Sequence, residues 1–128
     1  MAQPTMSGVE WVVEAFGCSS RSLRDLVVVG SLFERIIREM KLSPVGETQW
    51  HQFPDTGGIT GLCLLAESHL ACHTFPEHGS LCLNLFCCLP RAEWNFEMAL
   101  KELFATDTVS VRRLQRPYVG VLKQAASD

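Results

Sequence analysis

The residues best able to do chemistry lie near the middle of this 128-residue chain. Glu67, Ser68 and His73 fall within seven residues, between two apolar runs at 59–66 and 81–89 that are typical of buried strands. A serine hydroxyl is a weak nucleophile until a base activates it, and the chain contains no Gly-x-Ser-x-Gly turn. The sequence therefore disfavours a serine hydrolase, and composition alone leaves open whether this polar segment is a turn or a site.

The composition indicates a single globular domain, residues 1–128, with a modest core. Hydrophobic residues make up 47% of the chain and charged residues 20%, which is an ordinary balance at this length. The net charge of −3 and the lack of a basic run argue against nucleic acid as a partner. The apolar segments are shorter than a membrane span, and the N-terminus lacks a basic-then-apolar signal pattern. We therefore expect a cytoplasmic protein with neither a nucleic-acid nor a membrane partner.

The cysteines are expected to be reduced thiols, most of them small core residues. None of the six is spaced Cys-x-x-Cys, and they are Cys18, Cys63, Cys72, Cys82, Cys87 and Cys88. A zinc site could be imagined from His69, Cys72, His73 and Cys82. The paired spacing that is typical of structural zinc is absent, so we expect no metal.

Hydrophobic periodicity predicts strands and two helices. The strands are expected at 9–16, 48–53, 59–66, across the central polar segment, at 81–88 and at 108–114. Ser22, with Asp25 three positions later, is typical of a helix N-cap. The apolar face of this helix would be Leu23, Leu26, Val27, Phe33, Ile37 and Met40, with an end at Ser43-Pro44. Pro90 is expected to open a second helix that buries Ala92, Phe96, Ala99, Leu100 and Leu103.

This order, β-α-β-β-β-β-α-β, predicts an α+β fold: a two-layer α/β sandwich in which a mostly antiparallel sheet has both helices on one face. The other face of the sheet would be free for a partner, so we expect a homodimer. Trp50 is expected to be a core or edge aromatic rather than a ligand-stacking one. Residues 1–7 are expected to be a loose start and 124–128 a frayed tail.

The central segment also resembles that of a known family. Glu67-Ser68-His69 followed by His73-Thr74-Phe75-Pro76-Glu77 is similar to the processing segment of the small prokaryotic S-adenosylmethionine decarboxylases, Glu-Ser-His-x-x-x-His-Thr-Trp-Pro-Glu. The likeness extends over most of the chain. Gly8–Cys18 is similar to the family's first strand and Gly-Cys turn, Leu23 and Asp25 to its Leu-x-Asp, and Phe86 and Cys88 to its Phe-Thr-Cys.

The resemblance implies a self-cleaving proenzyme. Ser68 would attack the carbonyl of Glu67, and cleavage between them would leave chains 1–67 and 68–128, the second beginning with a pyruvoyl group made from Ser68. His73 matches the family's processing histidine, and Thr60 stands where the family has a processing serine. Cys88 matches the cysteine that protonates the product, whereas Cys87 is expected to face the core.

For the substrate, the resemblance implies S-adenosylmethionine. Glu77 would bind the ribose hydroxyls, Phe53 is the candidate for stacking on adenine, and Phe75 keeps the aromatic surface of the usual tryptophan. The expected function is that of a pyruvoyl-dependent carboxy-lyase of polyamine biosynthesis, which supplies aminopropyl groups for spermidine.

Three departures from the family pattern keep alternatives open. Glu10 replaces a histidine, Asn84 replaces an aspartate, and the segment 53–60 is one residue longer, which moves Phe53 relative to the processing centre. A pyruvoyl-dependent ornithine or arginine decarboxylase is one alternative, because the Glu10 carboxylate could meet a substrate cation. A non-catalytic paralogue that regulates an active decarboxylase is another, although the processing residues are all present.

Overall fold

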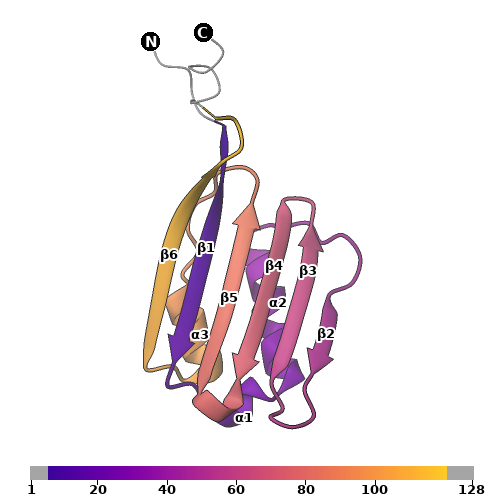
Figure 1. The fold of residues 1–128 in the computed structure, drawn as a ribbon, viewed down its shortest axis with the longest axis vertical. Coiled ribbons are helices and arrows are strands. Elements are labelled where there is room, and N and C mark those ends of the chain that lie inside the picture. Colours follow the sequence, from indigo (N-terminus) through magenta and orange to yellow (C-terminus); the bar gives the residue numbers. More distant parts are fainter. Residues whose placement is uncertain (1–5, 121–128) are drawn as a thin grey trace.

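The computed structural model describes residues 6–120. Its elements are β1 (Ser7–Phe16), α1 (Ser20–Leu23), α2 (Leu26–Glu39), β2 (Gln49–Gln52), β3 (Ile59–Leu65), β4 (Ser68–Phe75), the 3₁₀ turn η1 (Pro76–His78), β5 (Ser80–Cys87), α3 (Phe96–Phe104) and β6 (Thr108–Pro117). The strands form one antiparallel sheet in the order β2-β3-β4-β5-β1-β6, and the helices cover one face of it (Figure 1). The expected two-layer α+β fold is confirmed.

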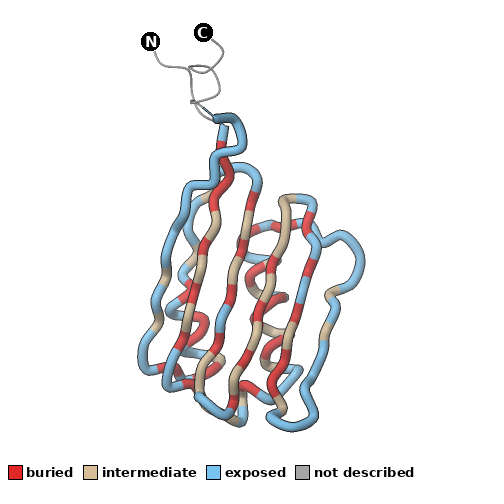
Figure 2. Tube along the Cα trace, viewed as in Figure 1, coloured by how far each residue is buried: buried red, intermediate tan, exposed pale blue. Residues whose placement is uncertain are grey.

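Side chains alternate between the two faces of the sheet, as Figure 2 shows along the central strands. On β4, Leu70, Cys72 and Thr74 are buried beneath the helices, whereas His69 and His73 are only partly buried on the opposite face. We call this second face the open face. It carries Glu10, Thr60, Leu62, Leu64, His69, His73, Cys82 and Asn84. The core on the helix side includes the fully buried rings of Trp11, Phe33, Phe96 and Phe104.

The short edge strand β2 is anchored by Trp50, which packs on the helix side. The ring of Trp50 lies 4.8 Å from that of Phe33. Trp50 also covers Gly61 on β3, where an added Cβ would come within 2.3 Å of the indole. The interpretation of Trp50 as a core aromatic is confirmed, and Gly61 is the residue that lets the indole lie flat on the sheet.

The first helix differs from the expectation, because it is broken in two. Ser19, and not Ser22, caps α1, while the Asp25 side chain accepts the backbone N–H of Val27 and caps α2. The break frees the carbonyl of Leu23, which accepts a 2.7 Å hydrogen bond from the Thr74 hydroxyl on β4. The restart also changes which side of the helix is buried. Val29, Leu32, Phe33 and Ile36 are buried, whereas the expected core residues Leu26 and Val27 are 43% and 76% exposed.

The second long helix also begins later than expected. Pro90 does not open it, and residues 90–95 are irregular, so Ala92 is exposed in the segment before the helix. α3 starts at Phe96, where the Asn95 side chain accepts the N–H of Met98 at 3.1 Å. An Asn cap satisfies one of the free N–H groups at the helix start, which a proline several residues earlier does not do.

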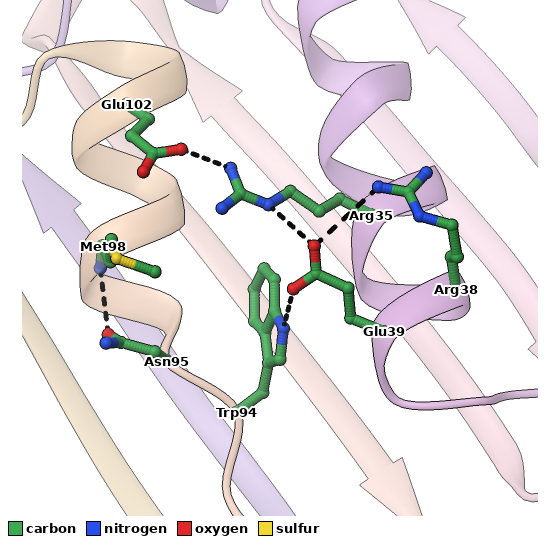
Figure 3. Close-up of polar contacts among 7 residues, drawn as sticks. All are labelled: Arg35, Arg38, Glu39, Trp94, Asn95, Met98 and Glu102. Atoms are coloured by element: carbon green, nitrogen blue, oxygen red, sulfur yellow. Dashed lines mark hydrogen bonds and ion pairs between the residues drawn. The ribbon is translucent and has the colours of Figure 1, made fainter.

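Polar contacts join α3 and the segment before it to α2 (Figure 3). Arg35 lies 2.7 Å from Glu102 on α3 and 3.2 Å from Glu39 on its own helix. The Trp94 indole N–H donates to Glu39 at 2.8 Å. These contacts are largely exposed, so they add little to the stability of the fold. Their main effect is to orient the 90–95 segment against α2.

β1 begins at Ser7, within the expected loose start, while residues 1–5 and the expected tail at 124–128 lie outside the described residues. In the part that the structure describes, no helix is long and apolar enough to cross a membrane. The cytoplasmic location stays a prediction.

Candidate active site

Ser68 lies at the start of β4, directly after a tight turn formed by Ala66 and Glu67, and Leu65 pairs with Ser68 across that turn. Two-residue hairpin turns usually place positive φ angles in the turn itself. Here Ala66 and Glu67 are not among the described residues with positive φ, and the unusual angle falls on Ser68, with φ of +152°. A non-glycine residue in such a conformation carries strain of about 1–3 kcal/mol, and such strain is typical of functional sites.

Glu67 is held by its backbone and by its side chain. Its carbonyl oxygen accepts the backbone N–H of Cys88 at 2.8 Å. Its carboxylate accepts the backbone N–H of Ser43 at 3.0 Å and lies 3.6 Å from the guanidinium of Arg91. Partial burial acts to raise the pKa of this carboxyl, but the Ser43 N–H and the Arg91 charge outweigh it and lower that pKa below its ordinary value.

The two adjacent cysteines differ in burial, because Cys87 is the last residue of β5 and Cys88 follows the strand. Cys87 pairs with Ser68 and is fully buried, and burial is the main cause that raises the pKa of its thiol. Cys88 is exposed, at the end of β5. Glu67, Ser68 and Cys88 therefore meet at one end of the β3–β4 hairpin. We call these three residues the cleavage group.

A second group lies on the open face at the other end of β4. Thr60 and His73 are paired across β3 and β4, with Thr60 Oγ1 2.5 Å from His73 Nδ1. The ring of His73 lies 5.5 Å from that of Phe53 and 4.3 Å from that of Phe75. Glu77 is exposed in η1, immediately after this end of β4. We call Phe53, Thr60, His73 and Phe75 the histidine group.

The longer segment between Phe53 and Thr60 does not carry Phe53 away from His73. The backbone N–H of Phe53 donates to Gly58 at 2.7 Å, and that of Gly57 donates back to Phe53 at 2.9 Å. These two bonds close the extra residue into a compact turn. With this turn in place, the ring of Phe53 lies 5.5 Å from that of His73.

One chain does not bring the two groups together. Ser68 and His73 are five residues apart on the same strand, which places their Cα atoms about 16 Å from each other. An imidazole must come within hydrogen-bond reach of the proton that it removes. The sequence predicts His73 and Ser68 as partners in one reaction. Within one protomer they lie on the same strand but are too far apart for His73 to act on Ser68.

Glu10 is already engaged on the open face. Its carboxylate accepts the side-chain amide of Asn84 at 3.1 Å and forms an ion pair with Arg116 on β6. Asn84 also lies 3.3 Å from the His69 ring. The substituted positions Glu10 and Asn84 therefore bond to each other. Sequence reasoning missed Arg116 and the Glu67 partner Arg91, because neither falls in a motif or a periodic pattern.

Two grooves hollow the open face. One, of about 360 Å³, is lined by residues that include Glu10, Glu14, Thr60, His73, Cys82 and Asn84. The other, of about 540 Å³, is lined by residues that include Val45, Leu62, Leu64, His69 and Ala71. Within residues 6–120 no three His, Cys, Asp or Glu side chains are placed to hold a metal ion. The groove that contains Thr60 and His73 is thus on the face that the helices leave uncovered.

The sequence and the fold both match a decarboxylase family. Residues 9–117 match the family model described as S-adenosylmethionine decarboxylase. The chain belongs to the S-adenosylmethionine decarboxylase family, a family of pyruvoyl-dependent carboxy-lyases whose members are made as proenzymes.

Individual relatives agree with this assignment. The S-adenosylmethionine decarboxylase proenzyme of Picrophilus torridus is 32% identical over 111 residues, covering 85% of this chain and 83% of the relative. Proenzyme 2 of Halalkalibacterium halodurans is 33% identical, covering 87% and 94%. The crystal structure of the adenosylmethionine decarboxylase from Aquifex aeolicus covers 92% of this chain and 97% of that one, with a TM-score of 0.78 and 20% identity. This last likeness concerns the fold.

Proposed function

We propose that this chain is the proenzyme of a decarboxylase that acts on S-adenosylmethionine in polyamine biosynthesis, and that it cleaves itself between Glu67 and Ser68. The observation that carries the proposal is the hairpin at residues 65–68. It places a strained serine directly after a carbonyl whose oxygen accepts the N–H of Cys88. The family to which the chain belongs supplies the class of reaction.

The first stage moves the acyl group from nitrogen to oxygen. Ser68 Oγ bonds to the carbonyl carbon of Glu67, the peptide C–N bond breaks, and the hydroxyl proton ends on the freed amine. Negative charge develops on the Glu67 oxygen in between. The backbone N–H of Cys88 lies 2.8 Å from that oxygen, and a donor aimed at developing charge is what this step requires.

The second stage breaks the chain. A base removes the Cα proton of Ser68, the Cβ–Oγ bond breaks, and Glu67 leaves as a carboxylate. The dehydroalanine that remains takes up water and loses ammonia, which leaves a pyruvoyl group at the start of chain 68–128. That group supplies the electron sink for loss of carbon dioxide from the substrate.

His73 is the base that we assign to this stage, and we propose that it comes from a second copy of the chain. In its own protomer it is about 16 Å from Ser68 along β4. Two open faces that pack in opposite directions would bring each cleavage group against the histidine group of the other copy. Leu62 and Leu64, 48% and 59% exposed there, favour such a cover.

For the substrate we assign adenine to the rings of Phe53 and Phe75, the ribose hydroxyls to Glu77, and protonation of the product to Cys88. Ornithine or arginine decarboxylation is not favoured, because the Glu10 carboxylate is already neutralised by Arg116. A regulatory paralogue is not favoured either, since Glu67, Ser68 and His73 are all in place.

The test is carbon dioxide release from carboxyl-labelled S-adenosylmethionine, ornithine and arginine by the cleaved protein. We expect release from S-adenosylmethionine and background from the two amino acids. Ser68→Ala is the control and should release none from any of the three. Turnover of ornithine or arginine in preference to S-adenosylmethionine, or equal turnover by Ser68→Ala, would refute the assignment.

A further inference from the structure

Arg91 contacts Glu67, the residue that precedes the proposed cleavage point, although the two are far apart in the sequence. It lies in the irregular segment between β5 and α3. One guanidinium nitrogen donates to the carbonyl of Met40 at 2.5 Å, at the end of α2. The other terminal nitrogen lies 3.6 Å from Oε2 of Glu67. The Arg91 side chain thus joins the end of α2 to Glu67.

The ion pair between Arg91 and Glu67 is partly buried. The side chains of Arg91 and Glu67 are only 29% and 19% exposed. Arg91 is the cation that the described residues place within ion-pair distance of Glu67. The Ser43 N–H holds the other carboxylate oxygen, so the carboxylate is fixed from two directions. A fixed side chain limits how the Glu67 backbone can turn.

The orientation of Glu67 matters because its carbonyl is the group under attack. That carbonyl must face Ser68 and keep the N–H of Cys88, three residues before Arg91, as its donor. Small errors in the geometry of reacting groups lower a rate steeply. Cleavage also puts a second carboxylate on Glu67, and a nearby guanidinium favours that added charge.

We propose that Arg91 is a positioning residue for self-cleavage, which holds the Glu67 side chain against the end of α2 so that the Glu67 carbonyl stays aligned with Ser68 and the Cys88 N–H. The inference rests on the proposed function, because it assigns a role in the cleavage at Glu67-Ser68. Arg91 acts through Glu67 and does not touch the substrate.

The experiment follows cleavage of freshly synthesised protein over time by intact mass. We expect Arg91→Ala to cleave about fivefold more slowly than the natural chain, the effect of losing one partly exposed ion pair. Arg91→Lys should be intermediate, because a point charge keeps only one of the two contacts. Added guanidinium ion should accelerate Arg91→Ala and leave the natural chain unchanged. A merely structural role would not give this rescue.

Arg38→Ala is the matched control, since Arg38 is 70% exposed, lies near the same helix end and, among residues 6–120, forms its ion pair with Glu39, at 3.8 Å. It should cleave at the natural rate. The inference is overturned if Arg91→Ala cleaves as fast as the natural chain, if guanidinium gives no rescue, or if Arg38→Ala is equally slow.

A second measurement separates this inference from the proposed function. If the natural chain never cleaves, the proposed function fails, whatever Arg91 does. In the uncleavable Ser68→Ala background, hydrogen exchange at the Cys88 N–H then reports the position of Glu67 directly. We expect about fivefold faster exchange when Arg91→Ala is added, and an unchanged rate would show that Arg91 does not position Glu67.

Discussion

The neighbouring cysteines Cys87 and Cys88 have different surroundings. Cys87, the last residue of β5, is fully buried, while Cys88, which follows the strand, is the exposed cysteine of the cleavage group. The backbone N–H of Cys88 donates to the Glu67 carbonyl, and its exposed thiol is the group to which we assign protonation of the product. One residue can therefore contribute to two reactions through different atoms.

This division predicts different outcomes for the two cysteines. Cys88→Ala keeps the backbone N–H, so the chain should still cleave, but turnover should fall about 100-fold or more, as expected for loss of a general acid. Cys87→Ala should lower the free energy of unfolding by about 1 kcal/mol through a small cavity and leave turnover per cleaved chain near the natural value. Chemical denaturation and substrate turnover measure the two effects. Full turnover by Cys88→Ala would show that another group donates the proton.

At the scale of elements, the sequence predicted the sheet well and the helix boundaries poorly. The alternating and apolar runs in the sequence predict the ends of most strands to within one or two residues. Burial of one face of the sheet makes every second residue of a strand apolar, and this alternation is visible in the sequence. The break before α2 depends on the Thr74 hydroxyl, 51 residues from the Leu23 carbonyl that it binds. No local pattern signals such a contact. The contacts of Arg91 and Arg116 were missed for the same reason, since their partners lie 24 and 106 residues away.

The start of α3 gives a test at this scale. Asn95→Ala removes the acceptor for the Met98 N–H and should lower the free energy of unfolding by about 1 kcal/mol. Asn95→Asp keeps an acceptor and adds a negative charge at the helix N-terminus, so it should retain stability. Thermal or urea unfolding at a fixed protein concentration measures both. If the two variants were equally destabilised, the capping role of Asn95 would be wrong.

In the whole molecule, the open face of the sheet is where most of the candidate site residues and the exposed apolar side chains lie together. It holds the histidine group, both grooves and the exposed Leu62 and Leu64. The cleavage group lies at the other end of β4, and our proposal is that another copy of the chain, packed on this face, completes the site. The sequence predicted both groups of residues, and the structure shows that Ser68 and His73 stand at different ends of the single strand β4.

Mixed dimers test this arrangement. Ser68→Ala and His73→Ala chains, distinguished by a mass tag, are each expected to remain uncleaved when made alone. In a mixed dimer the Ser68→Ala chain still offers His73, so the His73→Ala chain should be cut, while the Ser68→Ala chain stays intact. Intact mass of the purified mixed dimer reads the result. A His73→Ala chain that stays whole beside Ser68→Ala would place the base within its own protomer.

The central claim, self-cleavage between Glu67 and Ser68, is tested most directly by the denatured intact mass of freshly purified protein. We expect two masses, one for residues 1–67 and one for residues 68–128 that is lighter than the unmodified sequence because Ser68 has become a pyruvoyl group. Ser68→Ala, treated in the same way, should give one full-length mass. A single full-length mass from the natural chain, or a cut at any other bond, would contradict the account.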